Sequence, residues 1–110
     1  SLGMGLGLGT FTYCGYTITI TPTDPDHPGQ AGTIAIDATF GDGEDATVVN
    51  LDGTYLQTDD RPPTLIIELS GTIRTPEGTT DVSDTWTFAP REKKMVWKTI
   101  IAWVESLIAS

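Results

Sequence analysis

Alternation of threonine with apolar residues is the feature that most restricts how this chain can fold. In the run 16–21 (YTITIT), Tyr16, Ile18 and Ile20 occupy every second position, and threonines fill the positions between them. Successive side chains of a β-strand point to opposite faces, so a period of two predicts a strand with one buried and one solvated face. The run 33–40 (TIAIDATF) repeats this pattern. The sequence therefore predicts an antiparallel sheet with one polar face.

Three further strands are predicted by the same reasoning. They cover residues 46–58, 64–74 and 81–88, and the second of these is the most apolar run of the chain. Asp52 and Gly53 lie inside the first run, where they are compatible with a bulge or a turn. Segments rich in proline, glycine and aspartate separate the runs, because these residues favour turns and cannot continue a strand ladder. A β-meander is the simplest topology for five such strands.

The character of the sequence changes at Pro90, after which glycine is absent and Thr99 is the last threonine. Apolar residues recur at spacings of three and four over residues 91–109, which predicts an amphipathic helix with Pro90 in its first turn. The apolar arc is wider than packing on one sheet requires. Packing on the sheet or in a barrel mouth, a share in an oligomer interface, and attachment to a membrane surface all stay open. The residues that would form the interface are Trp97, Ile100, Ile101, Trp103, Val104, Leu107 and Ile108.

These patterns predict a mainly β fold of the α+β class. We expect an antiparallel five-stranded sheet, curled into a sandwich or a partial barrel, with one C-terminal α-helix packed on it. A chain of 110 residues has room for one hydrophobic core. Glycine occupies alternate positions in residues 1–9, so this segment is expected to be a flexible arm or an edge strand. Residues 10–110 are expected to form a single β-rich domain.

Charge and length exclude some classes of function. The net charge is −9, and an acidic chain lacks the clustered Lys and Arg that contact nucleic-acid backbones. Residues 1–90 contain 13 acidic side chains and only two basic ones, Arg61 and Arg74. Residues 91–110, in contrast, contain slightly more basic than acidic side chains. No apolar run approaches the roughly 20 residues of a membrane-spanning helix. One cysteine cannot form an intramolecular disulfide, so the sequence favours a reducing cytoplasm, while a virion or a cell surface stays open.

Residues typical of catalysis are scarce. His27, the only histidine, lies between Asp26 and Pro28 in a proline-rich segment that gives a poor platform for a catalytic triad. Cys14 lies in an apolar and aromatic run, and we expect it to be a small buried hydrophobic residue. Metalloprotease, hydrolase and dithiol motifs are absent from the sequence. We therefore expect no enzyme activity and no cofactor.

The acidic segment 41–45 is the strongest local chemical signal. Asp42, Glu44 and Asp45 are separated by a single glycine, and calcium prefers several oxygen ligands from one flexible loop. An EF-hand loop that starts at Asp42 would have Gly53 at its twelfth position in place of glutamate. The sequence supports a partial calcium site here, with a solvated acidic hairpin tip as the alternative.

A short motif in the same region is similar to a known family. Phe40-Gly41-Asp42-Gly43 resembles the F-G-D-G turn of polycystic-kidney-disease-type β-sandwich repeats, and the runs 63–69 and 78–81 resemble the final hairpin of that family. The tryptophan-aspartate pair of the family is replaced by Ala38-Thr39, and a C-terminal helix departs from its pattern. The resemblance implies a β-sandwich and assigns no functional residue.

Three functions are compatible with these observations. The first is a non-catalytic structural, assembly or protein-interaction module that self-associates, a design found among small phage and bacterial assembly proteins. The second is a small-molecule-binding β-barrel, and the third is a calcium-stabilised extracellular β-sandwich binding module. The aromatic residues that would line the cavity of a barrel are Tyr13, Tyr16, Phe40, Tyr55, Trp86 and Phe88.

Overall fold

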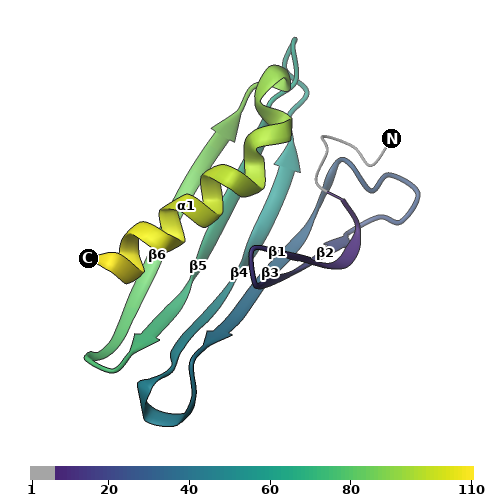
Figure 1. Cartoon of the computed structure of the whole chain (residues 1–110). Coiled ribbons are helices and arrows are strands. Elements are labelled where there is room, and N and C mark those ends of the chain that lie inside the picture. Colours follow the sequence, from purple (N-terminus) through teal and green to yellow (C-terminus); the bar gives the residue numbers. More distant parts are fainter. Residues whose placement is uncertain (1–6) are drawn as a thin grey trace.

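The computed structural model of the chain describes residues 7–110. It contains one six-stranded antiparallel sheet, in which the strands follow chain order, and one C-terminal helix on one face of that sheet (Figure 1). The strands are β1 (Gly9–Tyr13), β2 (Tyr16–Pro22), β3 (Ala31–Phe40), β4 (Thr47–Gln57), β5 (Leu65–Thr75) and β6 (Gly78–Phe88). The predicted fold class is confirmed, with six strands in place of five. The sheet is not closed, since β1 and β6 each have one neighbouring strand.

The strand absent from the prediction is β1, which pairs with β2. Cys14 and Gly15 form the two-residue turn between them, and both have positive φ angles, 51° and 86°. Positive φ at both central residues is typical of the tight turns that match the twist of a β-hairpin. Cys14 is therefore exposed at the tip of a hairpin. The expectation of a buried thiol was wrong. The hairpin turn, and not the apolar residues on either side, determines where the Cys14 side chain lies. The part of the predicted arm before Gly7 lies outside the described residues.

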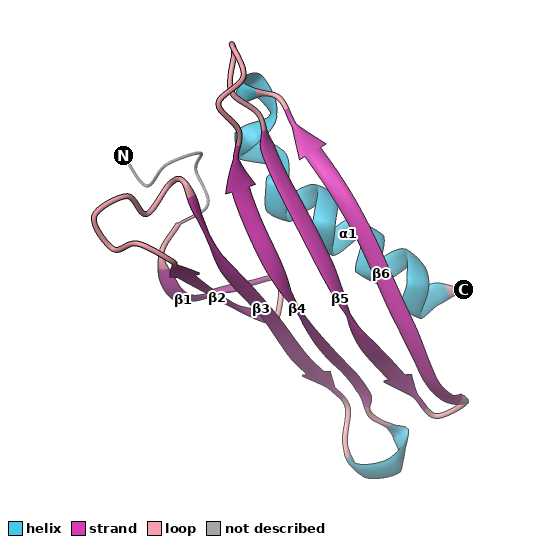
Figure 2. Ribbon diagram, turned by 180° about the vertical axis from the view of Figure 1, so that it is seen from behind, coloured by secondary structure: helices cyan, strands magenta, loops and turns pink. Residues whose placement is uncertain are grey.

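The two faces of the sheet differ in the way that the threonine alternation predicts. The inner face carries apolar side chains such as Ile18, Ile36 and Ile67, each fully buried. The outer face carries most of the threonines together with Asp37, Asp52 and other polar residues. Seen from behind, no helix of residues 7–110 covers this outer face (Figure 2). Residues 7–110 consequently share a single core, between the inner face of the sheet and the helix.

The central strands are long and regularly paired. β4 pairs with β3 over Thr47–Leu56 and with β5 over Val48–Gln57, without a turn inside it. Gly53 is paired on both sides, so the bulge or turn considered at this position does not interrupt the strand. A Cβ at Gly53 would lie well inside 3.0 Å of the backbone carbonyl of Glu68. Glycine is needed here because β4 and β5 approach more closely than a larger residue allows.

The C-terminal helix begins later than the sequence pattern indicates. Residues Pro90–Met95 form a 3-10 helix (η2), and the α-helix α1 covers Val96–Ala109. The carboxylate of Glu92 accepts a hydrogen bond of 2.8 Å from the backbone N–H of Ala89, which caps the start of η2. α1 then runs across the inner face of the sheet (Figure 1). No helix within residues 7–110 is long and apolar enough to cross a membrane.

Candidate functional site

Most of the helix residues predicted to form an interface lie in the core of their own chain. Ile100 and Val104 are fully buried, Ile101 is 4 % exposed and Trp97 is 8 % exposed. The ring of Trp97 also makes an edge contact with Phe11 of β1, with 6.0 Å between ring centroids. These four side chains fix α1 to the sheet. They are therefore core residues in the single chain.

The other three predicted interface residues lie nearer the surface. Trp103, Leu107 and Ile108 are only partly buried, as are Val82 and Trp86 of β6. The rings of Trp86 and Trp103 meet edge to face, with centroids 5.0 Å apart and an interplanar angle of 81°. We call these five residues the edge strip, because they lie where α1 meets the last strand of the sheet.

A groove extends from the edge strip at the C-terminal end of α1. Its volume is about 580 Å³, and it lies between Leu107 and Ile108 of the helix and the first half of β6, including Thr80 and Val82. The groove opens beside the turn of Pro76 and Glu77 that connects β5 and β6. Partly buried apolar side chains and an open groove thus lie along the same edge of the sheet.

β6 is the edge strand beside this strip, and the sequence pattern did not predict an interface on this strand. It has 11 residues and contains no proline, lysine or arginine. The signal that points to β6 is its position, since the last strand of a meander lies at an edge. Neither hydropathy nor a motif marks Val82 and Trp86 as different from ordinary core residues.

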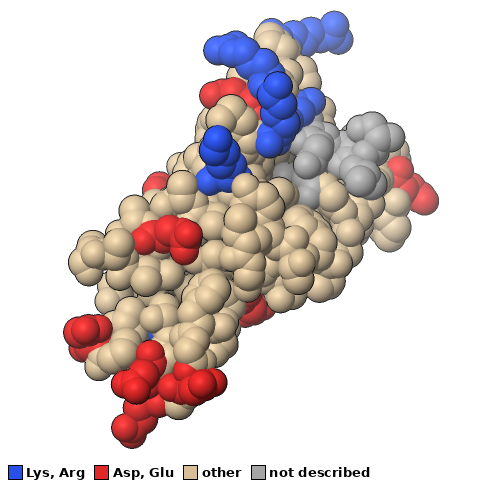
Figure 3. Space-filling view, in the orientation of Figure 1, with Lys and Arg blue, Asp and Glu red and all other residues tan. Residues whose placement is uncertain are grey.

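Charge is divided between the two ends of the molecule, which measures 46 Å along its longest axis. Lys and Arg side chains gather at one end, over η2 and the start of α1, and Asp and Glu side chains gather at the opposite end (Figure 3). The basic end carries Arg91, Lys93, Lys94 and Lys98. The opposite end carries the β3–β4 connection, with Asp42, Glu44 and Asp45, and the β5–β6 turn, with Glu77.

The three carboxylates of the calcium hypothesis lie on exposed residues around the short 3-10 helix Gly43–Asp45 (η1). Nowhere in residues 7–110 do three or more His, Cys, Asp or Glu side chains form a group that could hold a metal ion. The geometry gives no support to the calcium site, which stays a hypothesis.

Calcium provides a direct test of this hypothesis. A ligand that binds the native state raises its stability, by about 2.7 kcal/mol at a concentration of 100 Kd. For the scattered carboxylates of segment 41–45, we expect the melting temperature in calcium to equal that in EDTA within about 1 °C. A rise of about 10 °C in calcium would contradict this expectation and restore the site.

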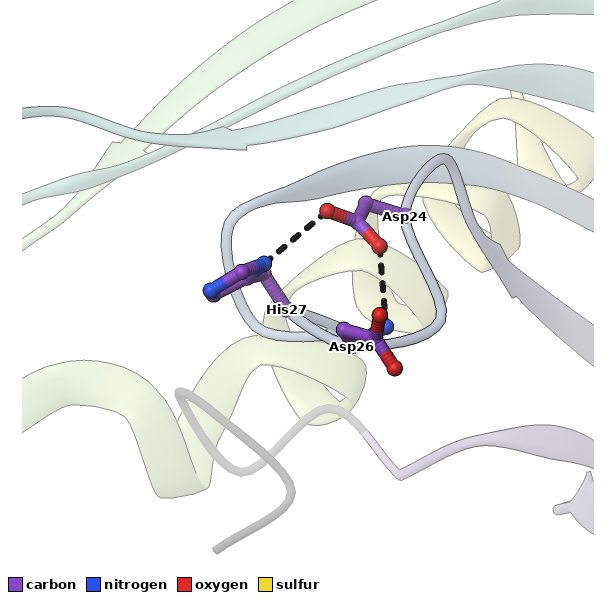
Figure 4. A network of polar contacts seen from close by, with 3 residues as sticks. All are labelled: Asp24, Asp26 and His27. Carbon is purple, nitrogen blue, oxygen red and sulfur yellow. Dashed lines mark hydrogen bonds and ion pairs between the residues drawn. The ribbon is translucent and has the colours of Figure 1, made fainter.

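The histidine takes part in a small network at the surface. Nδ1 of His27 lies 2.9 Å from Oδ2 of Asp24, and Oδ1 of Asp24 accepts a hydrogen bond from the backbone N–H of Asp26 (Figure 4). The bond from His27 and then that from Asp26 lower the pKa of the Asp24 carboxyl. Both side chains of the pair are more than half exposed. The network orders the β2–β3 loop, and its exposure fits a structural role better than a catalytic one.

The aromatic residues proposed to line a cavity serve mostly as core. Tyr16, Tyr55 and Phe88 are buried, whereas Phe40 is 36 % exposed. The hydroxyl of Tyr16 donates a 3.1 Å hydrogen bond to Glu105 of α1, and that of Tyr55 donates a 2.6 Å bond to the carbonyl of Pro28. Burial, followed by the bond and charge of Glu105, raises the pKa of Tyr16. These bonds tie the helix and the β2–β3 loop to the sheet.

No protein-family model, curated protein or solved structure matches this chain. The proposals below therefore depend on the geometry of its own residues.

Proposed function

We propose that this chain is a non-catalytic structural module that works by self-association. The observation that carries the proposal is the edge strand β6, which has 11 residues and borders the partly buried apolar edge strip. A long edge strand presents a row of backbone donors and acceptors that another strand can pair with. Apolar side chains beside such an edge add area that association would bury.

The distribution of ionisable groups supports a role without catalysis. Active sites shift pKa values by burying charged groups or by holding them close together. Every buried side chain of residues 7–110 is apolar or a tyrosine. His27 and its partner Asp24 lie at the surface, and so does Cys14. The buried ionisable side chains of residues 7–110 are Tyr16 and Tyr55, and each hydroxyl donates a hydrogen bond that connects two elements of the fold.

Natural proteins protect edge strands that must remain unpaired. They use charged side chains, lysine above all, inward-pointing charges, proline, bulges or very short strands for this purpose. β6 has 11 residues and no proline, lysine or bulge, so its edge protection is limited to the carboxylates of Asp81 and of Asp84, which lies opposite Leu69 on the inner face. β1, the opposite edge, has only five residues. We therefore place the association on β6 and not on β1.

A pair of matched proline substitutions tests the proposal. In Ser83→Pro, proline removes a backbone N–H that faces away from β5, so the internal ladder of the sheet is preserved. Thr12→Pro makes the corresponding change at the outward side of β1. We expect the unmodified chain to form a defined oligomer by light scattering at concentrations below about 1 mM, and Ser83→Pro to be monomeric. Thr12→Pro should retain the oligomer.

Circular dichroism in the near ultraviolet verifies that each variant keeps its tertiary packing. A monomer at every concentration for the unmodified chain would refute self-association. Loss of the oligomer in Thr12→Pro, with retention in Ser83→Pro, would move the contact to β1 and overturn the assignment of β6.

A further inference from the structure

The backbone groups of β6 that face away from β5 alternate along the strand. The turn of Pro76 and Glu77 has two residues, so the flanking residues Thr75 and Gly78 form a hydrogen-bonded pair, and such pairs recur at every second position. The backbone groups of the even-numbered residues of β6 therefore face β5. Within residues 7–110, no strand pairs with β6 on its other side. The residues whose N–H and C=O face that side are Thr79, Asp81, Ser83, Thr85 and Thr87. The N–H of Thr85 donates a 2.8 Å hydrogen bond to Oδ1 of Asp84, so pairing at Thr85 requires this carboxylate to move aside.

We propose that a second copy of this chain pairs with β6 in the antiparallel direction, across a two-fold axis at Ser83. The two six-stranded sheets then join into one continuous sheet, with one helix per copy on the same face. This inference rests on the proposed self-association and specifies its partner and geometry. A two-fold axis makes the contact self-complementary and closes the assembly at two copies.

The charges along this edge select the antiparallel direction. Glu77, at the turn before β6, and Asp81, in the first half of the strand, are acidic, whereas Asp84 lies just beyond the central residue Ser83. The segment directly after β6 carries Arg91, Lys93 and Lys94, with Glu92 between them. Antiparallel pairing places the basic segment of each copy beside the acidic half of the other. Parallel pairing would place acidic beside acidic and basic beside basic, which is unfavourable.

The same strand selects the position of the axis. With Ser83 opposite Ser83, residues Asp81 and Thr85 of the two copies face each other, and so do Thr79 and Thr87. All five outward residues of each copy are then paired. An axis at Asp84 or Asp81 would place a carboxylate opposite its own copy, which is destabilising. An axis at Val82 would leave Thr87 without a partner across the junction.

Cross-linking at Ser83 tests this geometry. The exposed Cys14 is first replaced in Cys14→Ser, and Ser83→Cys is added to that chain. Residues opposite each other in a hydrogen-bonded pair have Cα atoms about 5.5 Å apart, which a disulfide spans. Under copper-catalysed air oxidation, two thiols lose two protons and two electrons to oxygen and form one disulfide. We expect nearly complete covalent dimer on a non-reducing gel.

Ser70→Cys in the same Cys14→Ser background is the matched control. Ser70 lies directly opposite Ser83 on β5, on the same face of the sheet. In the proposed dimer, three strand spacings of about 4.8 Å separate the two copies of Ser70, too far for a disulfide. We expect this variant to stay reduced. A Ser83→Cys variant that associates but stays reduced, or a Ser70→Cys variant that cross-links equally fast, would overturn the pairing and leave self-association standing. A chain that never associates would refute the proposed function itself.

Charge reversal gives a second, independent measurement. In the proposed dimer, Arg91 lies beside the acidic half of the other copy. Because of the two-fold axis, Arg91→Glu changes two equivalent contacts in each dimer. We expect the dissociation constant to rise roughly tenfold at low salt. Adding Glu77→Lys to Arg91→Glu should restore association, because position 91 of one copy and position 77 of the other then carry opposite charges again. Failure of the double variant to recover would contradict the antiparallel arrangement.

Discussion

Ile100→Asp should leave this chain without a stable folded state. Ile100 is fully buried in the middle of α1, where the helix covers the inner face of the sheet. A carboxylate at this position would lose its hydration without gaining a partner, since no buried polar or charged side chain lies in the described core. We expect the free energy of unfolding to fall by about 5 kcal/mol or more, which is comparable to the whole stability of many domains. Urea unfolding followed by tryptophan fluorescence measures this loss.

Ala102→Asp is the matched control for this prediction. Ala102 lies two residues further along α1 and is exposed. Ala102→Asp introduces the same charge and loses more helix propensity than Ile100→Asp does, yet its cost should stay below about 1 kcal/mol because the site is exposed. Equal destabilisation by the two variants would mean that α1 does not pack on the sheet through the face containing Ile100.

Gly53→Ala is the second change for which we expect a large effect. The added methyl group would collide with the carbonyl of Glu68 in the neighbouring strand, and backbone atoms in the middle of a sheet cannot move aside cheaply. We expect a loss of about 3 kcal/mol in the free energy of unfolding, from a substitution that adds one carbon atom. The midpoint of urea unfolding reports this change, with the slope of the transition unchanged.

Thr54→Ala is the control for the glycine substitution. Thr54 is the next residue of β4, and its exposed side chain lies on the outer face. Its replacement should cost about 0.5 kcal/mol or less. If Gly53→Ala were tolerated as well as Thr54→Ala, the close approach of β4 and β5 at Gly53 would be refuted.

The period of two in the sequence was sufficient to predict the strands that carry it. β2, β3 and β5 fall within about two residues of their predicted bounds, because Ile18, Ile36 and Ile67 alternate with polar residues along them. β1 escaped prediction for a physical reason. It has five residues, and the turn that makes it a strand depends on Cys14 adopting a positive φ, which propensity does not favour.

The candidate site was predicted less well than the fold. The spacing of Trp97, Ile100 and Val104 shows that they share a helix face, and it does not show whether a sheet or a second chain covers that face. The structure assigns that face to the core and leaves Trp103 at its margin. The role of β6 depends on which strand lies at the edge and on the direction of its backbone groups. Both are properties of the assembled sheet, which local hydropathy does not encode.

The order of the elements along the chain also has a kinetic consequence during protein synthesis. Each strand pairs with the one before it, so the sheet can grow hairpin by hairpin as the chain emerges. The hydrogen bond from Tyr16 to Glu105, in contrast, spans 89 positions of sequence. At about 5 to 20 residues per second, the ribosome needs roughly 1 to 4 s to add the segment from Ala89 to Ala109 after β6 is complete. During that interval the apolar inner face of the nascent sheet is not yet covered by α1. The apolar surface available to a chaperone is then at its largest.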